Sequence, residues 1–167
     1  MKRLLIYTGL GNTLTAVLVS AVVYFFSPVH PLGQFRLLLG VVTLAWLIAG
    51  IRSLKYKVQA GDLKVTHGLL FSAGSGLVAA VSFGLVVWLL GTLSPVFWND
   101  YLADQLQNLG MASGLLETNY SPGTLAKLQD QIKNQTPATL ALRLSFFRWV
   151  WHLLVGGWVA VYFRTSH

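Results

Sequence analysis

The sequence predicts an all-α integral membrane protein: a four-helix bundle with two short amphipathic helices in the extracytoplasmic segment between the third and fourth spans. Three observations predict this fold. Hydrophobic residues make up 54% of the 167 residues, and charged residues only 10%. The mean hydropathy of +0.61 is typical of membrane proteins. Four apolar stretches approach the length of about 20 residues that a helix needs to cross a bilayer.

The predicted spans belong to one membrane domain, residues 1–167. They cover residues 4–26, 35–54, 69–93 and 144–163. The first span follows two basic residues, as a signal peptide would. Its apolar run is too long for a signal peptide, however, and no small-residue cleavage site follows it, so a retained helix is expected. The second span has the shortest apolar core and reaches spanning length only by including its interfacial ends.

The basic residues predict the orientation, because cytoplasmic loops of membrane proteins carry an excess of Lys and Arg. Seven of the twelve lie on one predicted side: Lys2, Arg3, Arg52, Lys55, Lys57, Lys64 and Arg164. The opposite side contains residues 94–138 and four of the five acidic residues. We therefore expect a multi-pass protein of the bacterial inner membrane with both termini in the cytoplasm.

The segment 94–138 is expected to be helical. Ser94-Pro95, Ser121-Pro122 and Thr136-Pro137 each place a capping hydroxyl before a proline at the first helical position. Helices are expected over 95–109 and 122–135, because both stretches have apolar residues at helical spacing. The simplest interpretation is a structural lid on the bundle or on the membrane surface, and the alternative is a surface for a partner.

Two spans carry small or weakly polar residues at every fourth position, which lets helix backbones approach closely. These residues are Thr8, Asn12, Ala16 and Ser20 in the first span, and Ser72, Gly76, Ala80 and Gly84 in the third. We interpret both faces as intramolecular helix-packing surfaces, with homodimerisation as the alternative. Asn12 is interpreted as a hydrogen-bonding group between helices rather than as a ligand-binding group.

The last span contains three ionisable residues, Arg143, Arg148 and His152. Both arginines are interpreted as anchors at the outer interface, beside the aromatic belt of Trp149 and Trp151. His152 lies deeper and is expected to be neutral and hydrogen-bonded to another span. The alternative is that the three residues bind a ligand or lipid, because ionisable groups inside a membrane are often functional.

Asp100 and Asp104 lie at the outer end of the third span, where either could form an ion pair with Arg143 or Arg148.

The sequence contains no pattern typical of a catalytic, metal-binding or nucleotide-binding site. It has no cysteine, no metal-ligand spacing among its histidines, and no nucleotide-binding glycine loop. No metal, cofactor, catalytic residue or nucleic-acid partner is expected.

The chain resembles small four-helix membrane proteins of the domain of unknown function 4199 family, found mainly in Bacteroidetes. The resemblance covers nearly the whole chain. It rests on GIRSLKYKVQAGDLKVTHGLLFSAGSGLVAAV at mid-chain, on SPVFWNDYLADQL, and on SPGTLAKL followed by the last span. The two arginines of the last span depart from the family pattern. The resemblance implies a four-helix inner-membrane fold and no particular activity.

The sequence therefore favours a non-enzymatic membrane protein that serves as an accessory or scaffold subunit of a larger complex. This hypothesis expects the lipid bilayer and other membrane subunits as partners. The alternative is a homo-oligomeric protein that transports or binds an anionic lipid, a quinone or a small anion, with Arg148 and His152 as the binding residues. The alternative requires those two side chains to face a cavity.

Overall fold

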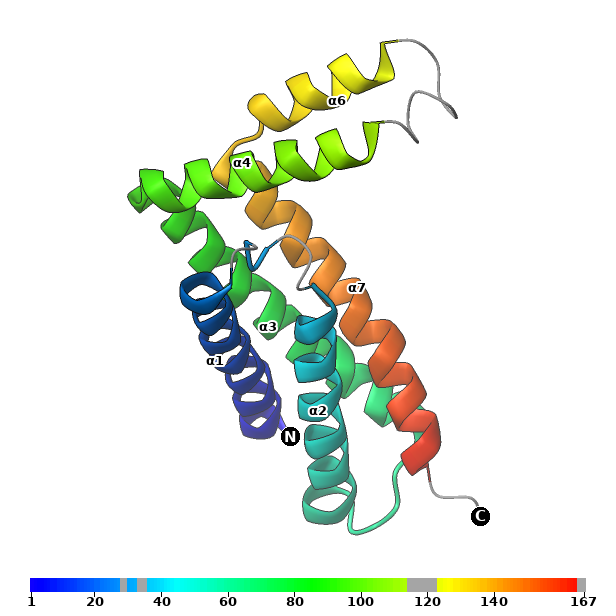
Figure 1. Cartoon of the computed structure of the whole chain (residues 1–167). Helices are drawn as coiled ribbons and strands as arrows, with labels where there is room; N and C mark the ends of the chain where they lie inside the picture. The colour runs from blue at the N-terminus through cyan, green and yellow to red at the C-terminus, as the bar shows by residue number, and fades with distance from the viewer. Residues whose placement is uncertain (28–29, 33–35, 114–122, 165–167) are drawn as a thin grey trace.

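The computed structural model describes residues 1–27, 30–32, 36–113 and 123–164, and this part of the chain is helical and contains no β-strand. The helices are α1 (Lys2–Phe26), α2 (Arg36–Ser53), α3 (Val65–Leu93), α4 (Pro95–Met111), α6 (Thr124–Lys133) and α7 (Pro137–Phe163). Four helices, α1, α2, α3 and α7, are long and apolar enough to cross a membrane. The all-α membrane bundle predicted from the sequence is confirmed (Figure 1).

The spanning helices extend beyond the predicted spans. α3 begins at Val65 and α7 at Pro137, both before the apolar stretches that identify them. α2 continues through a π-helical turn, Leu54–Val58, which ends where the Gln59 amide donates to the Leu54 carbonyl at 3.0 Å. Hydropathy marks only the part of a helix that lies in hydrocarbon. The backbone stays helical through the headgroup region, where the helix ends find hydrogen-bond partners.

The caps of α4 and α7 follow the sequence signals. The Ser94 hydroxyl accepts from the Phe97 amide at 3.3 Å, and Thr136 and Thr139 form a reciprocal capping box. α6 differs, because its N-cap is Gly123 in the left-handed conformation, with φ of 86°. The start predicted at Pro122 is therefore too early, and the predicted cap residue Ser121 lies outside the described residues.

α3 and α7 run side by side through the bundle, while α1 and α2 lie against them (Figure 1). α4 and α6 form a pair that projects sideways across one end. The base of α4 is fixed there by Tyr101, which is 2% exposed and packs with Phe83, Leu140 and Leu32. A second apolar cluster, around Phe71, closes the opposite end of the bundle.

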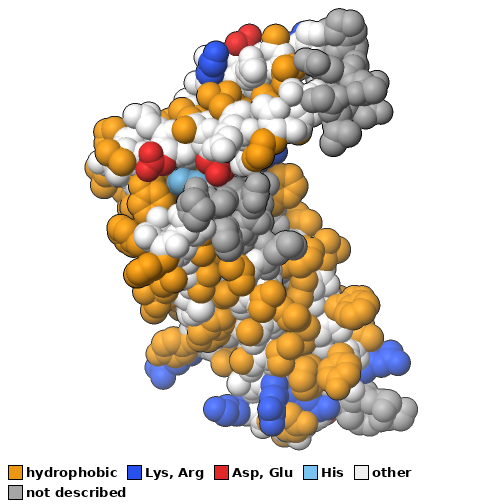
Figure 2. Space-filling model, viewed as in Figure 1, with side chains coloured by type: hydrophobic (Ala, Val, Ile, Leu, Met, Phe, Trp, Pro, Cys, Tyr) orange, Lys and Arg blue, Asp and Glu red, His pale blue; other side chains and the backbone are white. Residues whose placement is uncertain are grey.

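The charged side chains separate along the bundle. Figure 2 shows most of the visible Lys and Arg side chains at the end opposite α4 and α6, whereas the visible acidic side chains lie near α4 and α6, together with a few Lys or Arg side chains. We call the first end the basic end. It is held together in part by Lys55, whose ammonium group donates to the Phe163 carbonyl at 3.0 Å. This separation is the charge asymmetry on which the predicted orientation depends.

Candidate functional site

A hydrogen-bonded group of polar side chains crosses the centre of the bundle. We call it the polar centre: Asn12 of α1, Thr43 of α2, and Arg148 and His152 of α7. Asn12, Thr43 and His152 are at most 1% exposed, and Arg148 is 8% exposed. The Arg148 guanidinium donates to Asn12 Oδ1, and Asn12 Nδ2 donates to Thr43 Oγ1 at 3.4 Å. Three spanning helices are therefore tied together at one level.

The hydrogen bonds of the polar centre specify a neutral His152. Its Nδ1 lies 2.8 Å from the Arg148 carbonyl oxygen, which can only accept, so Nδ1 carries the hydrogen. Its Nε2 lies 2.9 Å from Asn12 Nδ2 and accepts a hydrogen bond there. The orientation of the Asn12 amide follows from the guanidinium, which only donates and therefore requires Oδ1 on its side. A protonated His152 would have no acceptor at Nε2.

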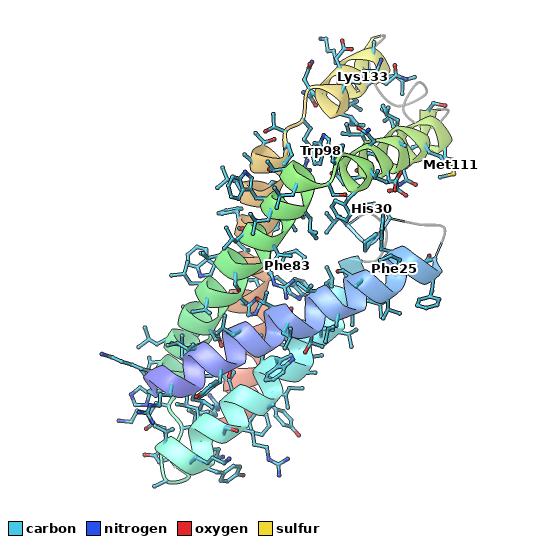
Figure 3. All side chains as sticks on the ribbon, turned by 90° about the vertical axis from the view of Figure 1, so that its left-hand side faces the viewer. Phe25, His30, Phe83, Trp98, Met111 and Lys133 are labelled. Carbon is cyan, nitrogen blue, oxygen red and sulfur yellow. The ribbon has the colours of Figure 1, made fainter. Side chains whose placement is uncertain are left out.

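The neighbouring helix α3 provides the space for these groups. A Cβ atom on Gly76 would lie 2.6 Å from His152 Cβ, so a glycine is needed where the histidine packs. The guanidinium carbon of Arg148 lies 4.4 Å from the centre of the Phe83 ring, in a cation–π contact. Figure 3 shows Phe83 about midway along the molecule. The arginine is therefore held between an amide and an aromatic face.

Arg148 has no acidic counterpart inside the bundle. None of the five Asp and Glu residues of the sequence lies in a spanning helix. Within the described part of the chain, the contacts of the guanidinium are Asn12 and the Phe83 ring, both of which are uncharged. The Arg148 Nε atom is buried there without a hydrogen-bond acceptor. The structure thus contains a buried cation whose charge and hydrogen-bonding capacity are only partly satisfied.

A groove of about 880 Å³ between α2 and α7 leads to this arginine. Its α2 wall consists of residues between Leu39 and Leu44, and its α7 wall of residues between Arg143 and Val159. Most of the lining residues are aliphatic or aromatic, and they also include Thr43, Arg143 and Arg148. The volume lies in the range of about 300–1,000 Å³ that is usual for pockets that bind small molecules.

The structure separates the three ionisable residues of the last span. Arg143 is exposed at the rim of the groove, where an interfacial anchor is expected. The anchor interpretation is wrong for Arg148, because its side chain turns into the bundle instead of extending along α7 to the interface. A buried amide acceptor in another helix offered a better partner than the headgroup region. His152 is hydrogen-bonded to another span, Asn12 of α1.

Neither Asp100 nor Asp104 forms the suggested ion pair with Arg143 or Arg148 in the structure. Asp100 accepts a hydrogen bond from the Tyr24 hydroxyl at 2.8 Å. Asp104 accepts from the His30 amide at 3.3 Å and from Asn108 at 3.0 Å. Both carboxylates therefore link α4 to other segments, Asp100 to Tyr24 of α1 and Asp104 to His30.

His30 occupies an aromatic site under α4, labelled in Figure 3. Its ring centre lies 4.7 Å from that of Phe97 and 5.3 Å from that of Tyr101. Burial lowers the pKa of His30 below its ordinary value, and the carboxylates of Asp104 and Asp100 oppose this effect in part. This cluster lies outside the polar centre and fixes the base of α4.

The small-residue faces both point into the molecule. On α3, a Cβ on Gly84 would meet Ser145, Gly76 lies against His152, and Ser72 lies against Gly156, all on α7. Ala80 is 2% exposed. On α1, Thr8, Asn12 and Ala16 are buried and Ser20 is half-buried. These surfaces are occupied within one chain, so neither is available for a homodimer.

Two contributors to the site were missed in the sequence. Thr43 carried a weak signal, since it is a polar residue within the apolar core of the second span. Phe83 carried none, because an aromatic residue in an apolar span is ordinary.

Searches against protein-family models, curated proteins and solved structures found no match to this chain. The resemblance to the domain of unknown function 4199 family therefore stays a prediction.

Proposed function

We propose that this membrane protein binds an anionic ligand in the α2–α7 groove, and that Arg148 contacts the negative charge. Asn12 and His152 act as positioning residues: Asn12 accepts a hydrogen bond from the guanidinium, and His152 holds the Asn12 amide in place. Neither residue lines the groove. The observation that carries the proposal is a buried arginine, inside a membrane bundle, that lines a groove and has no carboxylate partner among the residues that the structure describes.

The free-energy cost of burying the Arg148 charge exceeds what its contacts return. Removing an ion from water costs several kcal/mol even after the protein relaxes, unless an opposite charge compensates it. Hydrogen bonds to charged groups return about 1.5–3 kcal/mol, and a cation–π contact about 0.5–2 kcal/mol. Asn12 and Phe83 therefore recover only part of the cost. A carboxylate or phosphate would recover more, because it forms charge-assisted and often paired hydrogen bonds with a guanidinium.

Thermal unfolding with matched probes tests the proposal. The protein is placed in nanodiscs of a zwitterionic lipid and treated with hexadecanoate, with inorganic phosphate, or with hexadecanol as the uncharged match of hexadecanoate. We expect at least one anion to raise Tm, because a ligand that binds only the folded state stabilises it, by about 2.7 kcal/mol at a hundred times its Kd. Hexadecanol should leave Tm unchanged.

Two variants give the test its specificity. Arg148→Gln should abolish the Tm shift, whereas Lys57→Gln, which removes an equal charge from the exposed basic end, should retain it. If Arg148→Gln does not fold, Arg148→Lys replaces it and should retain a reduced shift, since lysine keeps the charge but loses the planar donor geometry. A shift that persists in Arg148→Gln, or an equal shift with hexadecanol, would contradict the proposal.

A second candidate function is that of an accessory or scaffold subunit, which the shape of the α4–α6 pair favours. α6 has no buried residue, and α4 anchors to the bundle mainly through its first turns. The pair thus projects sideways from the bundle as an arm (Figure 1). Native mass spectrometry after gentle extraction tests this function, since it requires a co-purifying membrane protein and is contradicted by a lone monomer.

The site also fits the proposed orientation, with the basic end in the cytoplasm of a bacterial cell and the α4–α6 pair outside. Arg148 then lies in the outer half of the bilayer. A cysteine at Ser53 should react only with a membrane-permeant reagent in intact cells, and one at Asn99 should also react with an impermeant reagent. Labelling of both by the impermeant reagent would overturn this orientation.

A further inference from the structure

The α2–α7 groove continues far beyond the arginine. Its α7 wall runs from Arg143 to Val159, a length of about 24 Å along a helix axis. Between Arg148 and Trp158 the wall extends for about 15 Å, roughly half the thickness of the hydrocarbon core. No charged residue lines this lower part within the described chain. The groove thus combines two arginines, Arg143 and Arg148, at one end with a long apolar part beyond them.

The groove also opens sideways, toward the lipid. Three α7 side chains of the lower wall remain largely uncovered by the protein: Trp151 is 48% exposed, Leu154 63% and Trp158 85%. In a spanning helix these surfaces meet hydrocarbon. A small hydrated anion would have to leave water and cross apolar surroundings to reach Arg148, at a large cost in free energy. A molecule already dissolved in the bilayer can enter laterally.

We infer that the ligand is a lipid with an anionic headgroup and a long acyl chain. This inference rests on the proposed function and names the ligand class for the same site. The carboxylate or phosphate contacts Arg148, with Arg143 at the rim as the second cation. The acyl chain then runs along Trp151, Leu154 and Trp158 toward the basic end.

The charges of Arg148 and Arg143 disfavour uncharged and choline lipids in the groove. An uncharged lipid would fill the apolar channel but leave Arg148 uncompensated. A choline headgroup would place its quaternary ammonium near the exposed Arg143, where like charges repel. The apolar channel gives little affinity by itself, because a lipid chain meets a similar environment in the bilayer. It fixes the position of the chain, while the arginine supplies the selectivity.

Photo-crosslinking with hexadecanoate that carries a diazirine near its chain end tests this arrangement. The protein is reconstituted in zwitterionic nanodiscs, and the adducts are mapped by mass spectrometry. We expect adducts on residues 151–159 of α7 or 39–44 of α2, and at least a tenfold loss of them in Arg148→Gln. Leu154→Trp fills the lower groove and should cause a similar loss. Leu142→Trp, on the same helix but away from the groove, should not.

The outcomes separate the two proposals. Adducts spread evenly over the lipid-facing helices, and unchanged in Arg148→Gln, would show annular lipid only and contradict the lipid inference, whereas anion binding is contradicted only by the thermal-unfolding test. Thermal stabilisation by phosphate through Arg148, without adducts in the lower groove, would overturn the lipid inference and leave anion binding intact. Groove adducts that Leu154→Trp does not reduce would also overturn the lipid inference. If Arg148→Gln fails to fold, Arg148→Lys should show a partial loss of adducts.

Discussion

The two sides of α7 meet their neighbours in opposite ways. Toward α3 the contact is tight, because Gly68, Gly76 and Gly84 of α3 and Gly156 of α7 leave no room for a methyl group. Toward α2 the contact opens into a groove of about 880 Å³. A Cβ on Gly40 of α2 would approach Trp151 only to 3.6 Å. One helix therefore carries a closely packed surface on one side and an open groove on the other.

This difference shows what determines closure between helices in a membrane. Lipid gives helices no hydrophobic reason to associate. Close packing at small residues and hydrogen bonds between helices must therefore hold them together. The α3 side of the α3–α7 interface has Gly68, Gly76 and Gly84 at about every second turn. The α2–α7 groove is instead lined by large side chains such as Phe147, Trp151 and Trp158. The polar centre lies where the two interfaces meet.

Loss of the polar centre is expected to have the largest effect on stability. Asn12→Ala removes the acceptor of Arg148 and the donor to His152 Nε2, and leaves both buried. We expect a loss of about 3–5 kcal/mol in the free energy of unfolding, as for other groups stranded when a buried partner is removed. Denaturant or steric-trap unfolding in bicelles measures it.

Thr15→Val is the matched control on α1, since Thr15 only accepts one hydrogen bond, from Trp46 Nε1 at 3.1 Å. It should cost about 1 kcal/mol. If Asn12→Ala costs no more than this control, the polar centre does not tie the two interfaces together.

A pair of glycine substitutions compares the two interfaces directly. Gly76→Ala places a methyl group 2.6 Å from His152 Cβ, so α3 and α7 must separate. We expect a loss of about 1–3 kcal/mol, which is typical of overpacking. Gly40→Ala meets ordinary contact distances and should be neutral or should stabilise α2 by up to about 1 kcal/mol. Equal losses in both variants would show that the α2–α7 interface is as closed as the α3–α7 interface.

A smaller effect is expected from pH at the base of α4, remote from both interfaces. Burial lowers the pKa of His30, so the unfolded chain binds a proton more readily than the folded chain as pH falls through about 6.5. The stability of this region should therefore be complete above that pH and decrease below it. The carboxylates of Asp104 and Asp100 limit the decrease.

Hydrogen exchange of the α4 amides at pH 7.5 and 5.5, corrected for intrinsic exchange rates, measures this effect. His30→Phe should remove most of the pH dependence while keeping the aromatic packing with Phe97 and Tyr101. Faster corrected exchange at the higher pH would reverse the predicted sign.

Much of the fold could be predicted because bilayer thickness and backbone hydrogen bonding leave few solutions. The four spans and the α4 and α7 caps follow from local sequence. The start of α6 was misplaced, because Gly123 in a left-handed conformation replaced the hydroxyl cap that the sequence suggested.

The site was predictable only in part. Ionisable residues in an apolar span identify Arg148 and His152 as unusual, and their spacing places both on one side of a helix. Whether Arg148 extends outward or turns inward depends on Asn12 and Thr43, which lie far away in sequence. The groove could not be predicted, since it results from the divergence of two interfaces and not from any motif.

The most direct test of the central claim is native mass spectrometry of the protein extracted from its membrane in a mild neutral detergent. We predict that the wild-type chain retains an anionic lipid, that Arg148→Gln loses this mass, and that Lys57→Gln keeps it. Fragmentation of the released lipid would identify its headgroup and chain. If wild type and Arg148→Gln retain anionic lipid to the same extent, or if the wild type retains none, Arg148 does not hold an anionic lipid and this central claim is contradicted.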